Sequence, residues 1–284
     1  MTERKPVAFH RPKKALGQNF LTDRNVLRRI ADLVDRGPGS RILEVGPGRG
    51  ALTRLLAEDG ARLLAVEVDR QLASFLQGEF AGVETVEIVQ ADILRTDLDA
   101  LLTRRCPGPW QVAANLPYNI SSQVLFLFLD RRHLFSRLVL MLQKEVGERL
   151  VAEPGTGEYG ILTVLFGLHF DIVREFPVKP GSFHPVPRVD SVVLSLRPLP
   201  VPRVEVVDEA FFRRVVKASF GQRRKTLRNC LKTLGPQERG EDLGRLLAGN
   251  GINWERRGET LSLEEFARLA ILLLPFAGGR KSLE

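Results

Sequence analysis

The chain has 284 residues, of which 44% are hydrophobic, and a formal net charge of +8. This length and composition predict a globular protein with one large domain, or with a large and a small one. No apolar run approaches the roughly 18 to 20 residues that cross a bilayer, so we expect no membrane segment. Two cysteines without CxxC spacing and four histidines without ligand spacing predict a reducing, cytoplasmic location and no metal.

Behind a basic arm, residues 1–14, predicted helices and strands alternate along the chain. Hydrophobic periodicity predicts helices over residues 22–34, 51–59, 70–80, 98–105 and 121–130. It predicts strands over residues 40–46, 61–69, 83–92 and 109–118, and strand-like or mixed apolar segments over 137–143, 160–176 and 191–198. This alternation predicts an α/β fold with a parallel sheet covered by helices on both faces.

The pattern changes at a proline-rich stretch that contains Pro198, Pro200 and Pro202. Proline cannot sit in a helix interior or a central strand, so this stretch is interpreted as a linker. Everything after it has helical periodicity, over residues 208–220, 222–234, 241–250 and 262–274. We therefore predict a larger domain over residues 15–198 and a small helical domain over residues 199–284.

The first predicted strand runs into a loop with glycines at Gly46, Gly48 and Gly50. Glycines let the backbone turn tightly and approach a ligand at the carboxyl end of a strand. The spacing is G-x-G-x-G and not the dinucleotide pattern G-x-G-x-x-G, which weakens a pyrophosphate interpretation. A tight turn without a ligand is the alternative.

Acidic residues close the next two predicted strands. Glu67 lies 21 residues after Gly46, where nucleotide-binding folds place an acid for ribose hydroxyls. Asp69 is the rival for this role, but Glu67 follows the apolar run directly. Asp92 ends the third strand and could accept a hydrogen bond from an adenine amino group. Carboxylates at successive strand ends predict a nucleoside-shaped site.

The fourth predicted strand ends in Asn115, Leu116, Pro117 and Tyr118. The Asn115 amide oxygen and the Leu116 carbonyl, oriented by Pro117, are two acceptors for an exocyclic amine. Accepting both N–H groups makes the nitrogen more nucleophilic, and Tyr118 offers a face on which a base can stack. The alternative is a strand end with a proline packed in the core.

These residues carry a resemblance to a known family. "NLPY" is similar to the [N/D]-P-P-[Y/F] motif of amino-directed adenine methyltransferases. Together with "GQNFL", "EVGPGRGALT", "VEVD" and "FHPVPRVDSVV", it resembles the ribosomal RNA adenine dimethyltransferases of the KsgA type, whose family includes the Erm enzymes. The resemblance covers almost the whole chain. It implies a Rossmann-like class I methyltransferase domain, dependent on S-adenosylmethionine, followed by a helical domain.

The resemblance also implies roles for individual residues. It places the cofactor against the "GQNFL" segment (Gln18, Asn19, Leu21), the glycine loop (Gly46, Gly48), Glu67, Asp92 and Asn115. The target would be two adjacent adenosines in the hairpin loop near the 3′ end of 16S (small-subunit) rRNA, in an immature 30S subunit. Phe183 matches an aromatic proposed to sandwich the base opposite Tyr118, although a core anchor explains it equally well.

Basic residues concentrate in the predicted helical domain. Residues 211–232 contain eight Lys or Arg and no acid, which favours contact with a polyanion over a solvated helix face. Arg223, Arg224, Lys225 and Arg228 are predicted to share one helix, with 224 and 228 on one face. We expect this face to bind RNA phosphates. A basic surface that only aids solubility is the alternative.

Three other functions fit parts of the sequence. An NAD-dependent dehydrogenase would share the glycine loop and Glu67 but leaves "NLPY" unexplained. A non-catalytic assembly factor or transcription-factor relative could keep the fold without methyl transfer. An Erm-type enzyme would act on large-subunit rRNA. The full "NLPYNIS" and the basic helical domain favour a small-subunit rRNA methyltransferase. We further expect a monomer that binds no metal and no membrane.

Overall fold

The computed structural model describes residues 12–13, 16–222, 224–234 and 240–276. The chain forms two compact units, the first made of Met1–Gly147 and Ile172–Pro198 and the second of Glu148–Asp171 and Leu199–Glu284. The second unit thus takes in Glu148–Asp171, which the sequence analysis placed with the larger domain. Its helix α7 (Ile161–His169) packs against α8 (Glu209–Phe220) and α11 (Leu263–Leu273), which explains the grouping.

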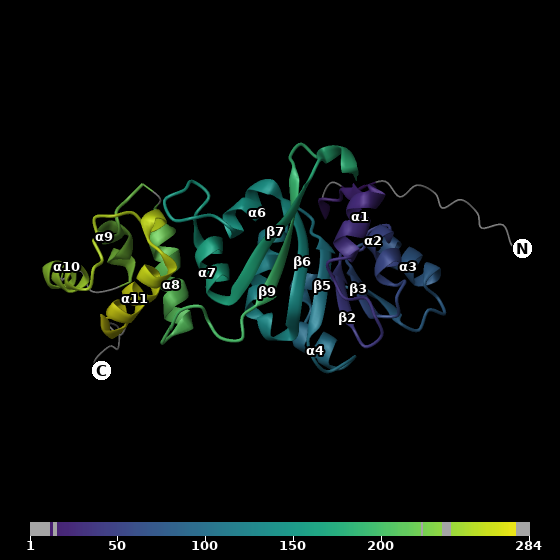
Figure 1. Ribbon diagram of the computed structural model, residues 1–284, viewed down its shortest axis with the longest axis horizontal. Helices are drawn as coiled ribbons and strands as arrows, with labels where there is room; N and C mark the ends of the chain where they lie inside the picture. Colours follow the sequence, from purple (N-terminus) through teal and green to yellow (C-terminus); the bar gives the residue numbers. More distant parts are fainter. Residues whose placement is uncertain (1–11, 14–15, 223, 235–239, 277–284) are drawn as a thin grey trace, which may run out of the picture. The chain divides into compact units, whose positions relative to one another are not determined.

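The first unit is built on a seven-stranded sheet with the strand order β4-β3-β2-β5-β6-β9-β7 (Figure 1). The strands are β2 (Arg41–Val45), β3 (Arg62–Glu67), β4 (Val86–Gln90), β5 (Trp110–Asn115), β6 (Phe135–Gln143), β7 (Phe170–Val178) and β9 (Ser191–Pro198). Strands β2 to β6 pair in parallel, whereas β9 runs antiparallel to β6. The predicted α/β fold is confirmed, with an antiparallel addition that the sequence pattern did not indicate.

Helices alternate with the parallel strands as predicted, from one helix before β2 to one after β6. They are α1 (Arg24–Ala31), α2 (Ala51–Leu56), α3 (Arg70–Glu79), α4 (Leu98–Thr103), α5 (Ser121–Asp130) and α6 (Lys144–Leu150). Helix α1 is capped by Asp23, whose side chain accepts hydrogen bonds from Asn25 N and Val26 N. Helix α5 begins at Ser121, and Ile120 at its cap position makes no side-chain cap hydrogen bond.

A two-stranded sheet that the sequence analysis did not predict joins the two ends of the first unit. Strand β1 (Phe20–Leu21) pairs antiparallel with β8 (Phe183–His184), in the register Leu21 to Phe183. Thr22 N also donates to Ser182 O at 2.8 Å. These bonds fix the segment before α1 against a loop more than 150 residues later in the chain.

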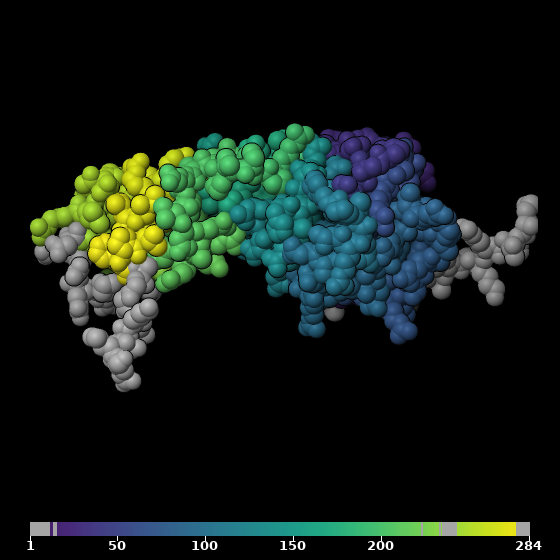
Figure 2. Space-filling view, turned by 90° about the horizontal axis from the view of Figure 1, so that it is seen from below, coloured from purple at the N-terminus to yellow at the C-terminus, as the bar shows by residue number. Residues whose placement is uncertain are grey.

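The second unit is helical. Besides α7, α8 and α11 it contains α9 (Leu227–Cys230) and α10 (Gly240–Gly249), and residues 199–208 form neither helix nor strand. Its core includes Phe212 and Phe266, and the Phe220 and Phe266 rings lie 5.7 Å apart. In the space-filling view the surfaces of α8 (green) and α11 (yellow) adjoin (Figure 2). None of the helices within the described ranges is long and apolar enough to span a membrane.

Candidate functional site

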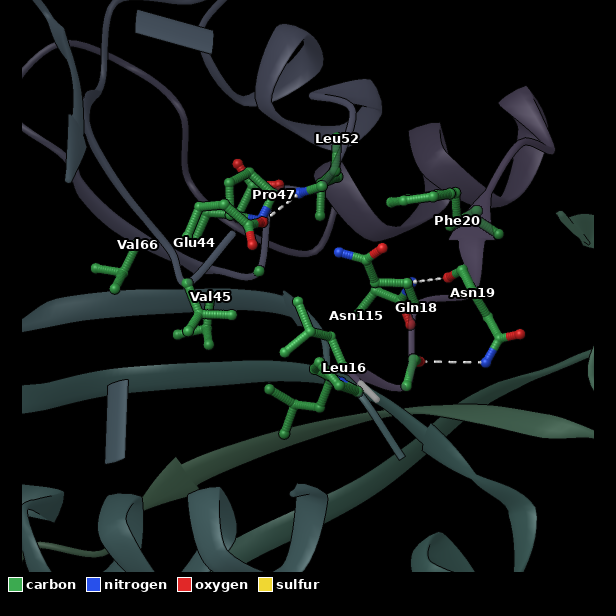
Figure 3. A pocket seen from close by; sticks show the side chains of 18 of the residues that line it. Leu16, Gln18, Asn19, Phe20, Glu44, Val45, Pro47, Leu52, Val66 and Asn115 are labelled. Carbon is green, nitrogen blue, oxygen red and sulfur yellow. Dashed lines mark hydrogen bonds between the residues drawn. The ribbon is translucent and has the colours of Figure 1, made fainter. Parts of the chain in front are cut away.

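A cavity of about 370 Å³ opens at the carboxyl ends of the parallel strands (Figure 3). It collects side chains from the ends of β2, β3 and β5, from the loop after β4 and from residues 16–22. Because parallel strands all end at the same edge of the sheet, residues far apart in sequence meet here. The predicted site residues on this cavity are Gln18, Asn19, Leu21, Gly46, Gly48, Glu67, Asp92, Asn115, Leu116, Pro117 and Tyr118.

The glycine loop requires residues without a side chain. Gly46 and Gly48 have φ of 69° and 58°, in the left-handed region that favours glycine. A Cβ at Gly48 would lie 3.0 Å from the Phe20 ring, and Gly48 N donates to Glu67 Oε2 at 3.0 Å. Any larger residue at Gly48 would therefore strain the loop and push Phe20 out of place.

Glu67 and its rival Asp69 have different surroundings. Glu67 lines the cavity, is only 4% exposed, and also accepts from Asp69 N at 2.9 Å. Burial raises its pKa, and the backbone hydrogen bonds oppose this shift in part. Asp69 is not part of the cavity lining, because its carboxylate caps α3 through Gln71 N and accepts from Gln18 Nε2 at 3.3 Å.

The segment before α1 borders the cavity and is fixed at several points. Lys13 Nζ lies 2.8 Å from Asp69 Oδ2, and Lys13 N donates to Gln18 Oε1 at 2.8 Å. Figure 3 shows the next link, in which Asn115 Nδ2 donates to Asn19 O at 3.2 Å. Leu21 is buried in the core with one side toward the cavity. "GQNFL" thus forms one wall of the site.

Asp92 occupies the cavity at the end of β4. Its side chain caps a short 3₁₀ turn by accepting from Leu94 N at 3.0 Å, and it remains 40% exposed. Arg95 lies 3.7 Å away on the solvent side. The carboxylate therefore keeps acceptor capacity toward a ligand.

The "NLPY" segment places its polar groups at the cavity. Asn115 donates through Nδ2 to Asn19 O, and its amide oxygen accepts no hydrogen bond from the described residues. Tyr118 lines the cavity as well, and its hydroxyl lies 2.8 Å from the hydroxyl of Ser191. Burial raises the pKa of Tyr118, so it stays neutral. Ser191, buried at the start of β9, is a supporting residue that no sequence signal indicated.

The structure places Phe183 in the core and not at the cavity. Its side chain is 2% exposed and belongs to the hydrophobic cluster that includes Leu21, Phe176 and Val178. It is not among the residues that line the cavity. Of the two interpretations of the sequence, this geometry corresponds to the core anchor and not to a face for base stacking.

Sequence reasoning missed Glu44, which lies on β2 and lines the cavity at 2% exposure. Its Oε2 atom has no hydrogen-bond partner among the described residues. Burial raises the pKa of Glu44 to about 8; the Thr53 hydroxyl opposes this shift, Glu67 adds to it and Arg54 opposes it. A glutamate inside the apolar run "ILEV" was the available signal.

The predicted basic helix in the second unit is wrong. Gln222 and Arg224 lie in a turn, in which Lys225 N donates to Gln222 O at 2.9 Å, and α9 begins only at Leu227. Residues 224 and 228 therefore do not share a helix face. Thr226, with an extended ψ of 159°, separates the turn from the helix. Arg223 lies outside the described residues.

The remaining cations of this segment differ in their surroundings. Arg224 and Lys225 are exposed. Arg228 lies 5.1 Å from the Trp254 ring and 3.4 Å from Glu255. Sequence spacing could not reveal Glu255, because the chain returns to this place only 27 residues later. Glu255 thus neutralises part of the positive charge of a stretch that contains no acid in its own sequence.

This strand order and a cavity at the strand ends define the class I methyltransferase fold. The family model for ribosomal RNA adenine dimethylase matches residues 9–270, so the chain belongs to the ribosomal RNA adenine dimethylase family. Proteins called ribosomal RNA small subunit methyltransferase A are similar. That of Geobacter metallireducens is 61% identical, covering 94% of this chain and 98% of its own. That of Geobacter sulfurreducens is 63% identical, and the match covers 95% of this chain and 97% of the relative.

Solved structures of related proteins have the same fold. A dimethyladenosine transferase from Plasmodium falciparum is 25% identical with a TM-score of 0.72, covering 90% of this chain and 96% of its own. The 23S rRNA methyltransferase ErmE is 27% identical with a TM-score of 0.66, covering 90% and 99%. The alternative of a dinucleotide dehydrogenase is therefore excluded.

Proposed function

We propose that this protein transfers methyl groups from S-adenosylmethionine to the exocyclic amino groups of two adjacent adenosines in the 3′-terminal hairpin loop of small-subunit rRNA. The observation that carries the proposal is Asn115 in the cavity lining, whose amide nitrogen donates to Asn19 O and whose oxygen accepts no hydrogen bond from the described residues. Family membership supports adenine dimethylation, and the small-subunit names of highly identical relatives favour that rRNA.

The residues at the cavity fit S-adenosylmethionine. A volume of about 370 Å³ lies within the range of small-molecule sites. The lining includes the buried acids Glu44 and Glu67, which suit a ligand with positive charge, and Asp92, which keeps acceptor capacity. Apolar side chains such as Leu52, Val66 and Ile93 border the same space and suit an adenine ring.

We assign the cofactor-binding roles along the cavity wall. Gly46 and Gly48 let the backbone approach the amino-acid part, and Gln18, Asn19 and Leu21 close the opposite side. Glu67 accepts from the ribose hydroxyls, and Asp92 accepts from the adenine amino group.

The catalytic roles belong to "NLPY". The Asn115 oxygen and the Leu116 carbonyl accept the N–H groups of the target amine, which keeps its lone pair available. When bound, S-adenosylmethionine would supply an activated methyl group for this nitrogen, with the thioether S-adenosylhomocysteine as the leaving group and the amine proton released to solvent. Tyr118, held by Ser191, supports the extruded base from one face. Alignment of the amine is the main contribution of the chain.

The helical region, residues 199–284, is proposed to bind rRNA phosphates through Arg224, Lys225, Arg228 and the neighbouring Arg223. The larger domain, residues 15–198, would then bind the cofactor, in a monomeric protein that acts in the cytoplasm on an immature small subunit without a metal. Within the described residues no group of three or more potential ligands forms a metal site.

Incubation with S-adenosylmethionine and small subunits that lack the modification tests this function. Mass spectrometry of the rRNA should show dimethyladenosine at both adjacent positions with the wild type and none with Asn115→Ala. Large subunits in a parallel reaction distinguish the Erm-type alternative, which predicts methylation there instead. Absence of methylation on both subunits would favour a non-catalytic relative.

A further inference from the structure

Two buried carboxyl groups on neighbouring strands line the proposed cofactor site. Glu44 on β2 and Glu67 on β3 are 2% and 4% exposed, and both line the cavity. The two strands are parallel neighbours, with Glu44 opposite Ala65, two residues before Glu67. Among the described residues no ion pair joins either carboxyl to a basic side chain. The negative charge of Glu67 disfavours ionisation of Glu44.

Glu44 is the less compensated member of this pair, since only the Thr53 hydroxyl and the charge of Arg54 oppose its raised pKa. Glu67 accepts hydrogen bonds from Gly48 N and Asp69 N, which favour its charged form. Glu44 Oε2 has no partner within the described residues. Burial raises the pKa of Glu44 to about 8, so that it is mostly protonated at neutral pH.

The charged groups around Glu44 do not remove this asymmetry. Glu67 on β3 repels the ionised form, whereas Arg54 on α2 attracts it. Arg54 is bound to Glu79 on α3, with Nε 2.6 Å from Oε1, so part of its charge is neutralised. Beyond β3, Asp69 adds negative charge next to Glu67.

We infer that Glu44 gives up its proton when a cationic ligand enters the cavity, so that cofactor binding is proton-linked and favours the sulfonium over its thioether product. The reason is electrostatic, because a positive charge in a site of low dielectric stabilises a nearby carboxylate strongly. S-adenosylmethionine carries one more positive charge than S-adenosylhomocysteine. Methyl transfer removes that charge, and Glu44 then takes up a proton again and weakens retention of the product.

This inference rests on the proposed function and concerns one of its steps. Dimethylation of two adenosines needs repeated exchange of spent cofactor. A site whose affinity for the product falls as soon as the methyl group has left would speed this exchange. Glu44 is therefore a specificity-determining residue of the cofactor site.

Calorimetric titration near neutral pH, in two buffers of different ionisation enthalpy, counts the protons released on binding. The wild type should release about one proton with S-adenosylmethionine and clearly less with S-adenosylhomocysteine. Its affinity for S-adenosylmethionine should rise by up to about tenfold per pH unit until pH ~8, and the preference over the product should rise with it. Glu44→Gln should lose this extra proton and the pH dependence.

Two further variants control for effects on folding. Glu44→Asp keeps a carboxyl at the position and should again release a proton. Glu58→Gln makes the same carboxyl-to-amide change at an exposed position outside the cavity and should match the wild type. The difference between the wild type and Glu44→Gln cancels any proton exchanged by the ligand's own amino group.

The inference is overturned if the wild type binds S-adenosylmethionine without proton release, if both ligands release equal amounts, or if Glu44→Gln still releases the extra proton. Binding without proton release leaves the proposed function intact. A wild-type protein that binds no S-adenosylmethionine would overturn the proposed function as well.

Discussion

The acidic side chains of the cavity, Glu44 and Glu67, and two basic side chains of the second unit, Arg224 and Lys225, have opposite environments. Glu44 and Glu67 are buried with little solvent around them, whereas Arg224 and Lys225 are exposed. Charges in the interior interact strongly and respond to pH and to single substitutions. Exposed charges are screened by salt and act additively. Cofactor binding in this protein should therefore respond to pH and to single substitutions, whereas RNA binding should respond mainly to salt.

The largest expected effect is a loss of methyl transfer when Asn115 is replaced. Asn115→Ala should lower the single-turnover rate of methyl transfer by about a hundredfold or more, the scale for a lost hydrogen bond to a reacting group. RNA affinity should change only a few-fold, because the amide oxygen acts on the reacting amine. Rates at saturating cofactor and RNA measure the first quantity. A rate close to that of the wild type would contradict the role of "NLPY".

Thermal unfolding measured at a series of pH values tests whether the buried Glu44 titrates. The raised pKa of Glu44, about 8 against 4.5 for the free group, means that the folded state holds a proton that the unfolded state releases. Its stabilising contribution is complete below pH ~4.5 and falls by at most about 1.4 kcal/mol per pH unit until pH ~8. The stability of Glu44→Gln should depend less on pH over this range, and the variant should become more stable relative to the wild type as pH rises. Parallel melting curves would contradict burial of a titrating carboxyl.

Replacing Glu67 tests whether the cavity carboxylate or its neighbour binds the ribose. Glu67→Ala should weaken S-adenosylmethionine binding by about 1 to 3 kcal/mol, the range for a hydrogen bond to a charged group. Asp69→Ala should act mainly on stability, because that carboxylate caps α3 and contacts Lys13. Calorimetry compares the two. A larger binding loss for Asp69→Ala would transfer the role.

The salt dependence of RNA binding tests the role of the exposed cations in the second unit. The double substitution of Arg224 and Lys225 by Gln should weaken RNA binding, and the log–log salt slope should fall by roughly 0.7 to 0.9 per lost phosphate contact. Cofactor affinity should stay unchanged. Arg62 and Arg104, two exposed cations of the first unit, provide the charge-matched control. A double variant that matches the wild type in RNA affinity and salt slope would indicate a surface that serves solubility alone.

The smallest effect is expected at Tyr118. Tyr118→Phe removes the hydroxyl that lies 2.8 Å from Ser191 but keeps the ring, so activity should fall only a few-fold, as for a net hydrogen bond of about 1 kcal/mol. Ser191→Ala should give a similar loss, and the double variant little more, because both remove the same bond. Additive losses would show that Tyr118 and Ser191 act independently.

Much of the site could be predicted because the ends of strands can be recognised from the sequence pattern. Glu67, Asp92 and Asn115 each follow an apolar run, and parallel pairing brings such positions to one edge of the sheet. Phe183 could not be decided in this way, because a phenylalanine before prolines suits a core and a stacking face equally well. Its pairing with Leu21 across the chain placed it in the core.

Local spacing along the chain was enough to predict the alternation of helices and strands, the glycine loop and the acceptors at the strand ends. Features that depend on residues far apart in the chain became known only from the folded structure. It placed Glu255 beside Arg228, broke the expected basic helix at Thr226, and joined Glu148–Asp171 to the helical unit. It also left Glu44 buried without a partner for Oε2, since burial and pairing are set by neighbours that linear spacing does not specify.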